Sequence, residues 1–352
     1  MNIPDKILID QISCGNVCAL IRDDILVDFF ADASKKNIGK NHINFGSIFY
    51  AKVERDLGGA NGSILDLGKS LKGFIKKSKE VSPGKKLMVQ CVNTAINGKL
   101  PLFSKDILIK EKYVIFNPSG KGVSLSKKLN NNDRFKKLKN KELEHIATDN
   151  AMGIILRGSC LDIEDQKIVE YVKKKLTKYC DLKIFVKTMP HILFEGYDAK
   201  DRALAEWSHV KDESVIESND CFEYHGVWES LESLKSESVE LSGGGSLTIE
   251  PTRALISVDI NTGKNLDKNA AFETNRLAMS ELPRQLRLRG LGGIVNIDFA
   301  PLKKTDRSSI ISVLRNHLIE DPVKTNIVGW SPVGNLELNR KNERTRITEW
   351  LK

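Results

Sequence analysis

The chain has 352 residues, of which 40% are hydrophobic and 29% are charged, and its formal net charge is +9. This composition is typical of a soluble protein of about two to four compact units, and the absence of an eighteen-residue apolar run excludes a transmembrane helix. The positive charge favours a polyanionic partner such as nucleic acid, although many lysine-rich proteins bind none.

The N-terminal sequence MNIPDKILIDQ lacks a basic segment followed by an apolar core, so we expect no signal peptide. The six cysteines are scattered without a CxxC pair, which argues against a zinc site and against disulfides. We therefore predict buried thiols and a cytoplasmic location.

Residues 1–43 contain two β-type runs, KILIDQI and VCALIRDDILVDFFA, with a hairpin turn predicted at Asp23 and Asp24. This piece is too small to fold alone. We expect it to complete a domain whose remainder lies later in the chain.

Residues 44–128 are predicted to form an OB-fold barrel of five short strands. The strands are INFGSIFYAKVERD, NGSILDLG, LKGFIKKSK, KKLMVQCVN and KYVIFNP. Residues 62–70 end like a nucleotide-binding P-loop, but five residues separate the glycines where that motif requires four. We therefore reject nucleotide binding.

Residues 129–190 are expected to combine a helix over 134–149, a buried strand in MGIILRGSC and an amphipathic helix over 164–179. Residues 183–235 are the least informative part of the chain. LKIFVK and PHILFEGYD have strand character, and a helix is expected after Asp198.

Residues 254–260 and 292–299 are two β-type runs that end near Asp259 and Asp298, and an arginine-rich helix is predicted between them. If the strands are neighbours, the two aspartates can share one Mg²⁺ ion, which takes oxygen ligands and commonly binds phosphates. The alternative is that each aspartate is a helix cap or turn former.

Beyond these strands, Asp306 is predicted to cap a helix whose apolar face contains Ile310, Ile311, Leu314 and Leu318. KTNIVGWSPVGNLELNRKNER then predicts two strand segments.

The sequence VDIN, followed by TNRLAMSELPRQLRLRGLGGIVNIDF, resembles the catalytic core of the ribonuclease E/G family in order and spacing. FNPSGKGVSLSKKL and VELSGGGSLTIEPTRAL resemble further segments of that family. The chain departs from the family pattern at Arg253, Arg276 and Pro283, and a proline inside a helix costs about 3 kcal/mol unless a kink is accommodated.

The resemblance implies a multidomain protein of mixed α/β and β structure. Its parts are an RNase H-like subdomain (1–43 and 191–238), an inserted OB-fold RNA-binding barrel (44–128), a 5′-sensor-like subdomain (129–190) and a DNase I-like catalytic subdomain (239–352). The zinc motif and small C-terminal domain of the large family members are not found in this sequence, so the zinc-linked tetramer is not expected.

The resemblance also implies the catalytic residues. Asp259 and Asp298 match the two aspartates that hold Mg²⁺, and Asn261 matches the asparagine that supports them. In the family, the metal activates a water for attack on an RNA phosphodiester.

RNA-binding residues are implied elsewhere in the chain. Phe74 matches an aromatic that stacks on a base, with a core phenylalanine as the alternative, while Ile64 stands where the family has a second aromatic. Arg157 matches an arginine that senses a 5′ phosphate, but Gly158 replaces the accompanying threonine, and a structural arginine is the alternative. Further expected RNA contacts, each with a solvated basic surface as the alternative, are Lys99, Lys324 and Arg340.

The preferred interpretation is a Mg²⁺-dependent endoribonuclease that cleaves single-stranded RNA in bacterial RNA processing or decay. The main alternative is an RNA-binding regulator or complex subunit that has lost cleavage. A DNA nuclease or phosphatase would also use two carboxylates but would not explain the barrel. A homo-oligomer without a zinc link and other RNA-decay proteins are the partners that the sequence leaves open.

Overall fold

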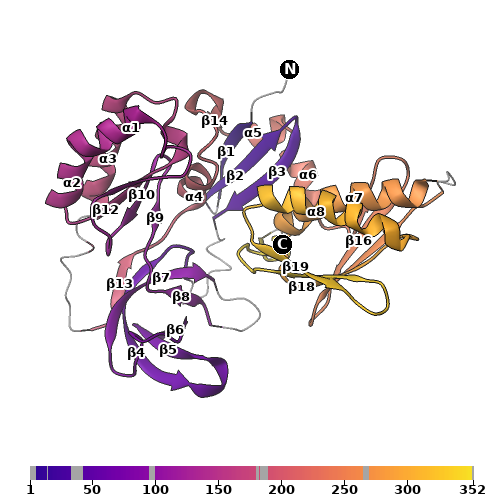
Figure 1. The fold of residues 1–352 in the computed structure, drawn as a ribbon, viewed down its shortest axis with the longest axis horizontal. Helices are drawn as coiled ribbons and strands as arrows, with labels where there is room; N and C mark the ends of the chain where they lie inside the picture. Colours follow the sequence, from indigo (N-terminus) through magenta and orange to yellow (C-terminus); the bar gives the residue numbers. More distant parts are fainter. Residues whose placement is uncertain are drawn as a thin grey trace. The chain divides into compact units, whose positions relative to one another are not determined.

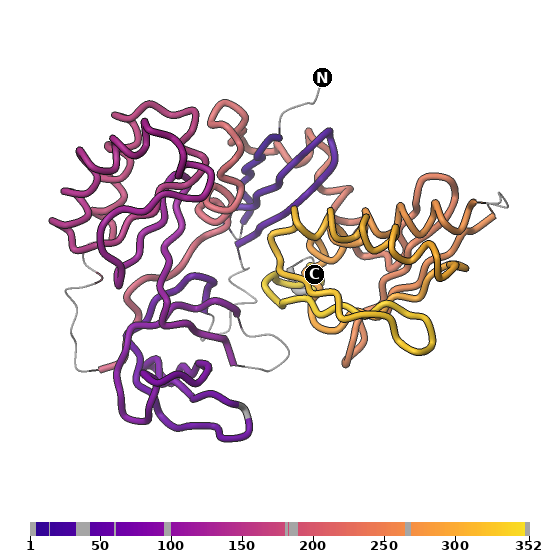
Figure 2. The backbone as a smooth tube through the Cα atoms, viewed as in Figure 1, coloured from indigo at the N-terminus to yellow at the C-terminus, as the bar shows by residue number. Residues whose placement is uncertain are grey.

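The computed structural model describes residues 5–13, 15–32, 43–94, 100–179, 182, 189–264 and 269–350. The chain divides into two compact units, Met1–Leu20 with Phe30–Asn219 and Ile21–Phe29 with Asp220–Lys352. Figures 1 and 2 show a mixed α/β chain, as predicted, and the described residues form four sheets. None of the helices in the described ranges combines the length and apolarity needed to cross a bilayer.

The first sheet has the strand order β14-β1-β2-β3. Its strands are β1 (Lys6–Ile12), β2 (Gly15–Arg22), β3 (Ile25–Ala31) and β14 (Val215–Glu217). β1 pairs in parallel with β14, so the intervening chain is inserted between two partners of one sheet. The predicted hairpin turn is confirmed, because Asp23 and Asp24 have φ angles of 49° and 60°, the left-handed values that a two-residue type I′ turn requires.

The second sheet closes into a five-stranded barrel, which is consistent with the predicted OB-fold. Its strands run in the order β4-β5-β6-β8-β7, a β4–β7 pairing closes the ring, and β13 extends β4 on its other side. Their bounds are β4 (Ile48–Leu57), β5 (Gly62–Gly68), β6 (Leu71–Lys76), β7 (Lys86–Asn93), β8 (Leu102–Ser104) and β13 (His191–Phe194). Val53, Leu65, Ile75, Val89 and Phe103 are among the residues that fill its core.

The prediction that KYVIFNP supplies the fifth barrel strand is wrong. That strand is β8, whereas KYVIFNP forms β10 (Val114–Asn117) in the third sheet, β11-β12-β10-β9. β10 joins this sheet because Val114 and Phe116 are buried there, with the Phe116 ring 5.7 Å from that of Tyr179. The other strands are β9 (Ile109–Lys110), β11 (Val123–Leu125) and β12 (Gly153–Leu156).

The helices beside the third sheet agree with the prediction. They are α1 (Asp133–Leu138), the π-helical turn η2 (Lys139–Leu143), α2 (Glu144–Asp149) and α3 (Asp165–Tyr179). The apolar face predicted for α3 is buried. α4 (Ala199–Glu206) follows Asp198, whose side chain accepts a hydrogen bond from the backbone N–H of Asp201. Residues 183–187 of the predicted strand LKIFVK lie outside the described residues.

The second compact unit is built on a six-stranded sheet of order β15-β16-β17-β18-β20-β19. The strands are β15 (Ser238–Glu240), β16 (Ser246–Pro251), β17 (Ile256–Asn261), β18 (Gly293–Asp298), β19 (Thr325–Trp330) and β20 (Leu336–Arg340). α7 (Ala270–Leu288) and α8 (Arg307–Glu320) share the sheet's hydrophobic core. α7 continues through Pro283, so this departure from the family pattern does not end the helix.

The remaining helices are short. They are α5 (Cys221–Tyr224), α6 (Val227–Ser233) and α9 (Ile347–Trp350), with the 3₁₀ turns η1 (Gly58–Ala60), η3 (Gly158–Cys160), η5 (Asp212–Ser214) and η6 (Lys304–Asp306).

The described cysteines Cys18, Cys91, Cys160 and Cys221 are buried thiols, as predicted. Burial raises the pKa of the Cys160 thiol to about 11, so this group is protonated at neutral pH.

Candidate active site

Asp259 and Asp298 are direct neighbours on the two central parallel strands of the second unit. β17 and β18 pair in a register that sets Asp259 opposite Asp298, and neighbouring strands lie about 4.8 Å apart. Val258, Ile260 and Ile297 are buried in the core while both aspartates are exposed. The alternation of strand side chains therefore directs both carboxylates to the face of the sheet opposite the core.

The alternative of helix-capping aspartates is not what the structure shows. Both residues belong to strands, and neither carboxylate accepts a hydrogen bond from a backbone N–H within the described part of the chain. Asn261 Nδ2 instead donates to Asp259 Oδ2. The predicted catalytic trio thus lies at the carboxyl ends of adjacent strands.

The chemistry of this trio fits a divalent cation. Two like charges directly opposite each other on neighbouring strands repel, and a cation between them removes that cost. The described residues contain no group of three or more His, Cys, Asp or Glu side chains arranged to hold a metal. An ion held by the two aspartates would complete its coordination with water and phosphate oxygens, as Mg²⁺ commonly does.

Two residues of α7 that were not predicted as site residues, although they begin the family-like segment TNRLAM, lie behind the carboxylates. Asn275 is fully buried on α7, and its Nδ2 donates to the carbonyl of Ala300, two residues after Asp298, at 3.0 Å. Thr274 packs so closely against Gly245 that a Cβ there would lie 2.6 Å from the threonine methyl group. Thr274 and Asn275 are adjacent polar residues at positions of α7 where the helical periodicity predicts apolar, buried side chains. This pattern is the sequence signal that could have identified them.

The prediction that Arg340 contacts RNA is wrong, as is its alternative of a solvated basic edge. Arg340 is 1% exposed, and its Nη2 lies 3.1 Å from Asp321 Oδ1. Strand alternation explains this, because Arg340 shares the inward-facing side of β20 with Leu336 and Leu338. Burial lowers the pKa of the Arg340 guanidinium, and Asp321 opposes that shift.

Asp321 is the centre of a buried ionic cluster in the same unit. Its Oδ2 lies 2.5 Å from Nη1 of Arg287, and its Oδ1 accepts a hydrogen bond from the backbone N–H of Val323 at 2.7 Å. Arg287 also lies 3.7 Å from Asp28 and donates to the carbonyl of Val27. The cluster therefore ties β3, α7 and β20 together.

Lys324, another predicted RNA contact, does not join the carboxylates. Lys324 is exposed and directly precedes β19. Thr325, the first residue of β19, lies opposite Arg340 on β20, and Arg340 lies opposite Gly293, the first residue of β18. Lys324 therefore lies near the start of β18, one strand length from Asp298 at its end. Lys99 lies outside the described residues.

Phe74 lies on the outer face of the barrel. Its neighbour Ile75 is in the barrel core, whereas Phe74 is half-buried and lies between Ile64 on β5 and Leu102 on β8. The ring extends over Gly62, where an added Cβ would lie 2.3 Å from the ring Cζ. The alternative of a core phenylalanine is therefore wrong, and the three apolar side chains form one row across three strands.

Arg157 has a clear structural role. Its Nη1 donates to the carbonyls of Glu111 at 2.7 Å and Ala205 at 2.5 Å, and burial lowers the pKa of the guanidinium. Any contact with a 5′ phosphate must use its other nitrogens, so sensing stays a prediction.

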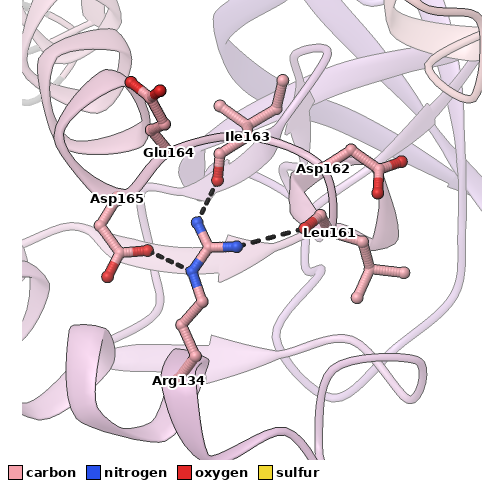
Figure 3. Close-up of a pocket in the computed structure, with 6 residues that line it drawn as sticks. All are labelled: Arg134, Leu161, Asp162, Ile163, Glu164 and Asp165. Carbon is pink, nitrogen blue, oxygen red and sulfur yellow. Dashed lines mark hydrogen bonds and ion pairs between the residues drawn. The ribbon is translucent and has the colours of Figure 1, made fainter.

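A separate pocket of about 430 Å³ surrounds Arg134 (Figure 3). The arginine donates to the carboxylate of Asp165 and to the carbonyls of Leu161 and Ile163. These bonds tie α1 to the segment before α3. Because each guanidinium nitrogen already has an acceptor, Arg134 holds these segments together and has no nitrogen left to bind a ligand in the pocket.

Comparison with known proteins supports the class that the sheet, the barrel and the motifs define. Residues 208–343, which include the carboxylate pair, match the model of the "Ribonuclease E/G family". Ribonuclease G of Salmonella typhimurium and ribonuclease G of Escherichia coli K12 are each 27% identical to this chain, over 86% of it and 73% of the relative. Ribonuclease E of a Synechocystis species is 23% identical over 86% of this chain and 53% of the relative.

A mixed α/β chain with a five-stranded barrel and a pair of strand-end carboxylates is thus matched by ribonucleases along most of its length. Residues 208–343 carry the match to the ribonuclease E/G family model, and most of the chain is similar to ribonucleases G and E.

Proposed function

We propose that this protein is an endoribonuclease that cleaves single-stranded RNA in RNA processing or decay, with Mg²⁺ held by Asp259 and Asp298. The register that places the two carboxylates opposite each other on parallel strands carries the proposal. The family relationship supplies the substrate class, since the relatives are ribonucleases G and E.

The residues of the site have distinct tasks in this proposal. When bound, Mg²⁺ would supply a Lewis acid and an activated water for attack on the phosphodiester. Asp259 and Asp298 hold that charge in place, and Asn261 orients Asp259 by hydrogen bonding to it. Asn275 holds the segment that follows Asp298. Water adds to phosphorus while one P–O bond to ribose breaks, and the water proton is transferred to the leaving oxygen.

We propose the remaining architecture as the family relationship implies it. The parallel β1–β14 pairing supports an RNase H-like subdomain interrupted by insertions, and the sheet of the second unit corresponds to the DNase I-like subdomain. Cytoplasmic location, a 5′-phosphate contact by Arg157 and a homo-oligomer without a zinc link are parts of the same proposal.

The direct test is cleavage of a fluorescent, AU-rich single-stranded RNA that carries a 5′ monophosphate, with Mg²⁺ and with EDTA. We expect fragments with Mg²⁺ and intact RNA with EDTA. Tight binding without cleavage under any divalent metal would instead identify an RNA-binding regulator.

We expect Phe74→Ala to weaken binding of single-stranded RNA by about 1–3 kcal/mol, because a base loses the ring on which it stacks. Fluorescence anisotropy with a labelled oligonucleotide in EDTA measures the effect. Tyr224→Ala, which removes an 87% exposed aromatic outside the barrel, is the matched control. Equal affinity of the two folded variants would contradict a stacking role for Phe74.

A further inference from the structure

Arg307, the first residue of α8, stacks on Trp330. Its guanidinium carbon lies 4.2 Å from the centre of the indole ring, and the indole in turn lies 5.3 Å from the ring of Phe299. Phe299 directly follows Asp298 in the chain. A chain of contacts from Phe299 through Trp330 to Arg307 therefore begins one residue from the candidate metal site.

Strand register places these contacts at the same strand ends as the carboxylates, on the face of the sheet that carries α7 and α8. Trp330 pairs with Leu336, and Leu336 pairs with Ile297, the residue before Asp298. β19 also runs in the same direction as β18, because both are antiparallel to β20. The last residue of β19 is thus level with the end of β18.

The guanidinium of Arg307 is held against the indole but has no polar partner among the described residues. Its Nε is buried without a hydrogen-bond partner, and its Nη groups make no hydrogen bond or ion pair with any residue that the structure describes. Stacking on an indole leaves the edge of a guanidinium available for hydrogen bonds in its own plane. Those donors suit the oxygens of a phosphate group.

The local charge also favours an anion. Lys303 and Lys304 are exposed just before α8, and the backbone N–H groups of the helix N-terminus add positive partial charge. A cation at a helix N-terminus is unfavourable by itself.

Asp306 is the acidic group next to Arg307, but its side chain makes no cap hydrogen bond to the helix. Asp306 thus occupies the N-cap position of α8, as predicted, but the capping hydrogen bond expected from its side chain is not formed.

We propose that Arg307, held against the Trp330 ring, binds a backbone phosphate of the single-stranded RNA that flanks the cleaved one. This inference rests on the proposed function, because it assigns one contact of the same RNA strand. It makes Arg307 a substrate-binding residue at the same strand ends as the candidate metal site.

Salt dependence of RNA binding tests the proposal. The affinity of a labelled single-stranded oligoribonucleotide is measured by anisotropy in EDTA at several KCl concentrations. Each phosphate contact to single-stranded RNA contributes about 0.7 to the slope of log K against log salt concentration. We expect Arg307→Gln to reduce the slope by about 0.7 and the affinity by about tenfold.

Arg315→Gln is the matched control, because Arg315 is exposed on the same helix and its loss changes the net charge equally. Arg315→Gln should keep the wild-type slope. If Arg307→Gln does not fold, Arg307→Met replaces it in the same measurement, because its unbranched side chain still covers the indole. The same reduction in the slope of log K against log salt concentration is expected. A wild-type slope and affinity in the folded Arg307 variant would overturn the inference. Failure of the wild-type protein to bind or cut RNA would instead overturn the proposed function.

Discussion

Replacing Asp298 by asparagine is expected to abolish cleavage while RNA binding is kept. The substitution preserves the shape of the side chain but removes half of the negative charge that would hold the metal. Loss of several kcal/mol of metal stabilisation corresponds to at least about a 10³-fold fall in cleavage rate. Asp259→Asn should behave in the same way, because the two carboxylates lie opposite each other across β17 and β18.

Cleavage rates over a range of Mg²⁺ concentrations, together with anisotropy in EDTA, measure both parts of this prediction. Glu250→Gln is the matched control, since Glu250 is an exposed carboxylate on β16 of the same sheet. We expect it to cleave at the wild-type rate. Full activity of either aspartate variant would refute the metal assignment, and parallel loss of RNA binding would point to a disturbed fold.

The second large effect concerns stability. Asp321→Ala is expected to destabilise the second unit by about 3–5 kcal/mol, because Arg287 and Arg340 would then be buried without their shared counter-charge. The backbone N–H of Val323 would lose its acceptor as well. For a unit of this size the change corresponds to a fall in Tm of roughly 6–20 °C.

Thermal unfolding followed by circular dichroism measures this effect. The adjacent Glu320 provides the control, because it is exposed and its replacement by alanine removes the same charge. We expect Glu320→Ala to unfold within about 2 °C of the wild type. Similar Tm values for the two variants would show that the ionic cluster does not hold the unit together.

Local sequence patterns predicted the elements that depend on short-range physics. Alternating apolar residues indicated β17 and β18, and helical periodicity indicated α3 and α8. Asp23 and Asp24 indicated a tight turn. These features are local because the spacing of side chains along a strand or helix decides which face can be buried.

Partner choice between strands was less predictable. KYVIFNP has the strand character expected, yet it pairs with β12 and not with the barrel, whose last strand is the short β8. Both arrangements satisfy the same alternation of buried and exposed residues. The choice depends on which surface Phe116 can fill, and that surface is assembled from α3, distant in the chain.

The candidate site shows the same division. The sequence by itself determined Asp259, Asn261 and Asp298 as candidates, because motif, order and spacing are properties of the chain. Only the tertiary structure decided that Arg340 is buried against Asp321, that Phe74 faces outward and that Arg307 stacks on Trp330. A charged or aromatic residue has the same local signature on either side of a strand, and its role depends on partners brought together by folding.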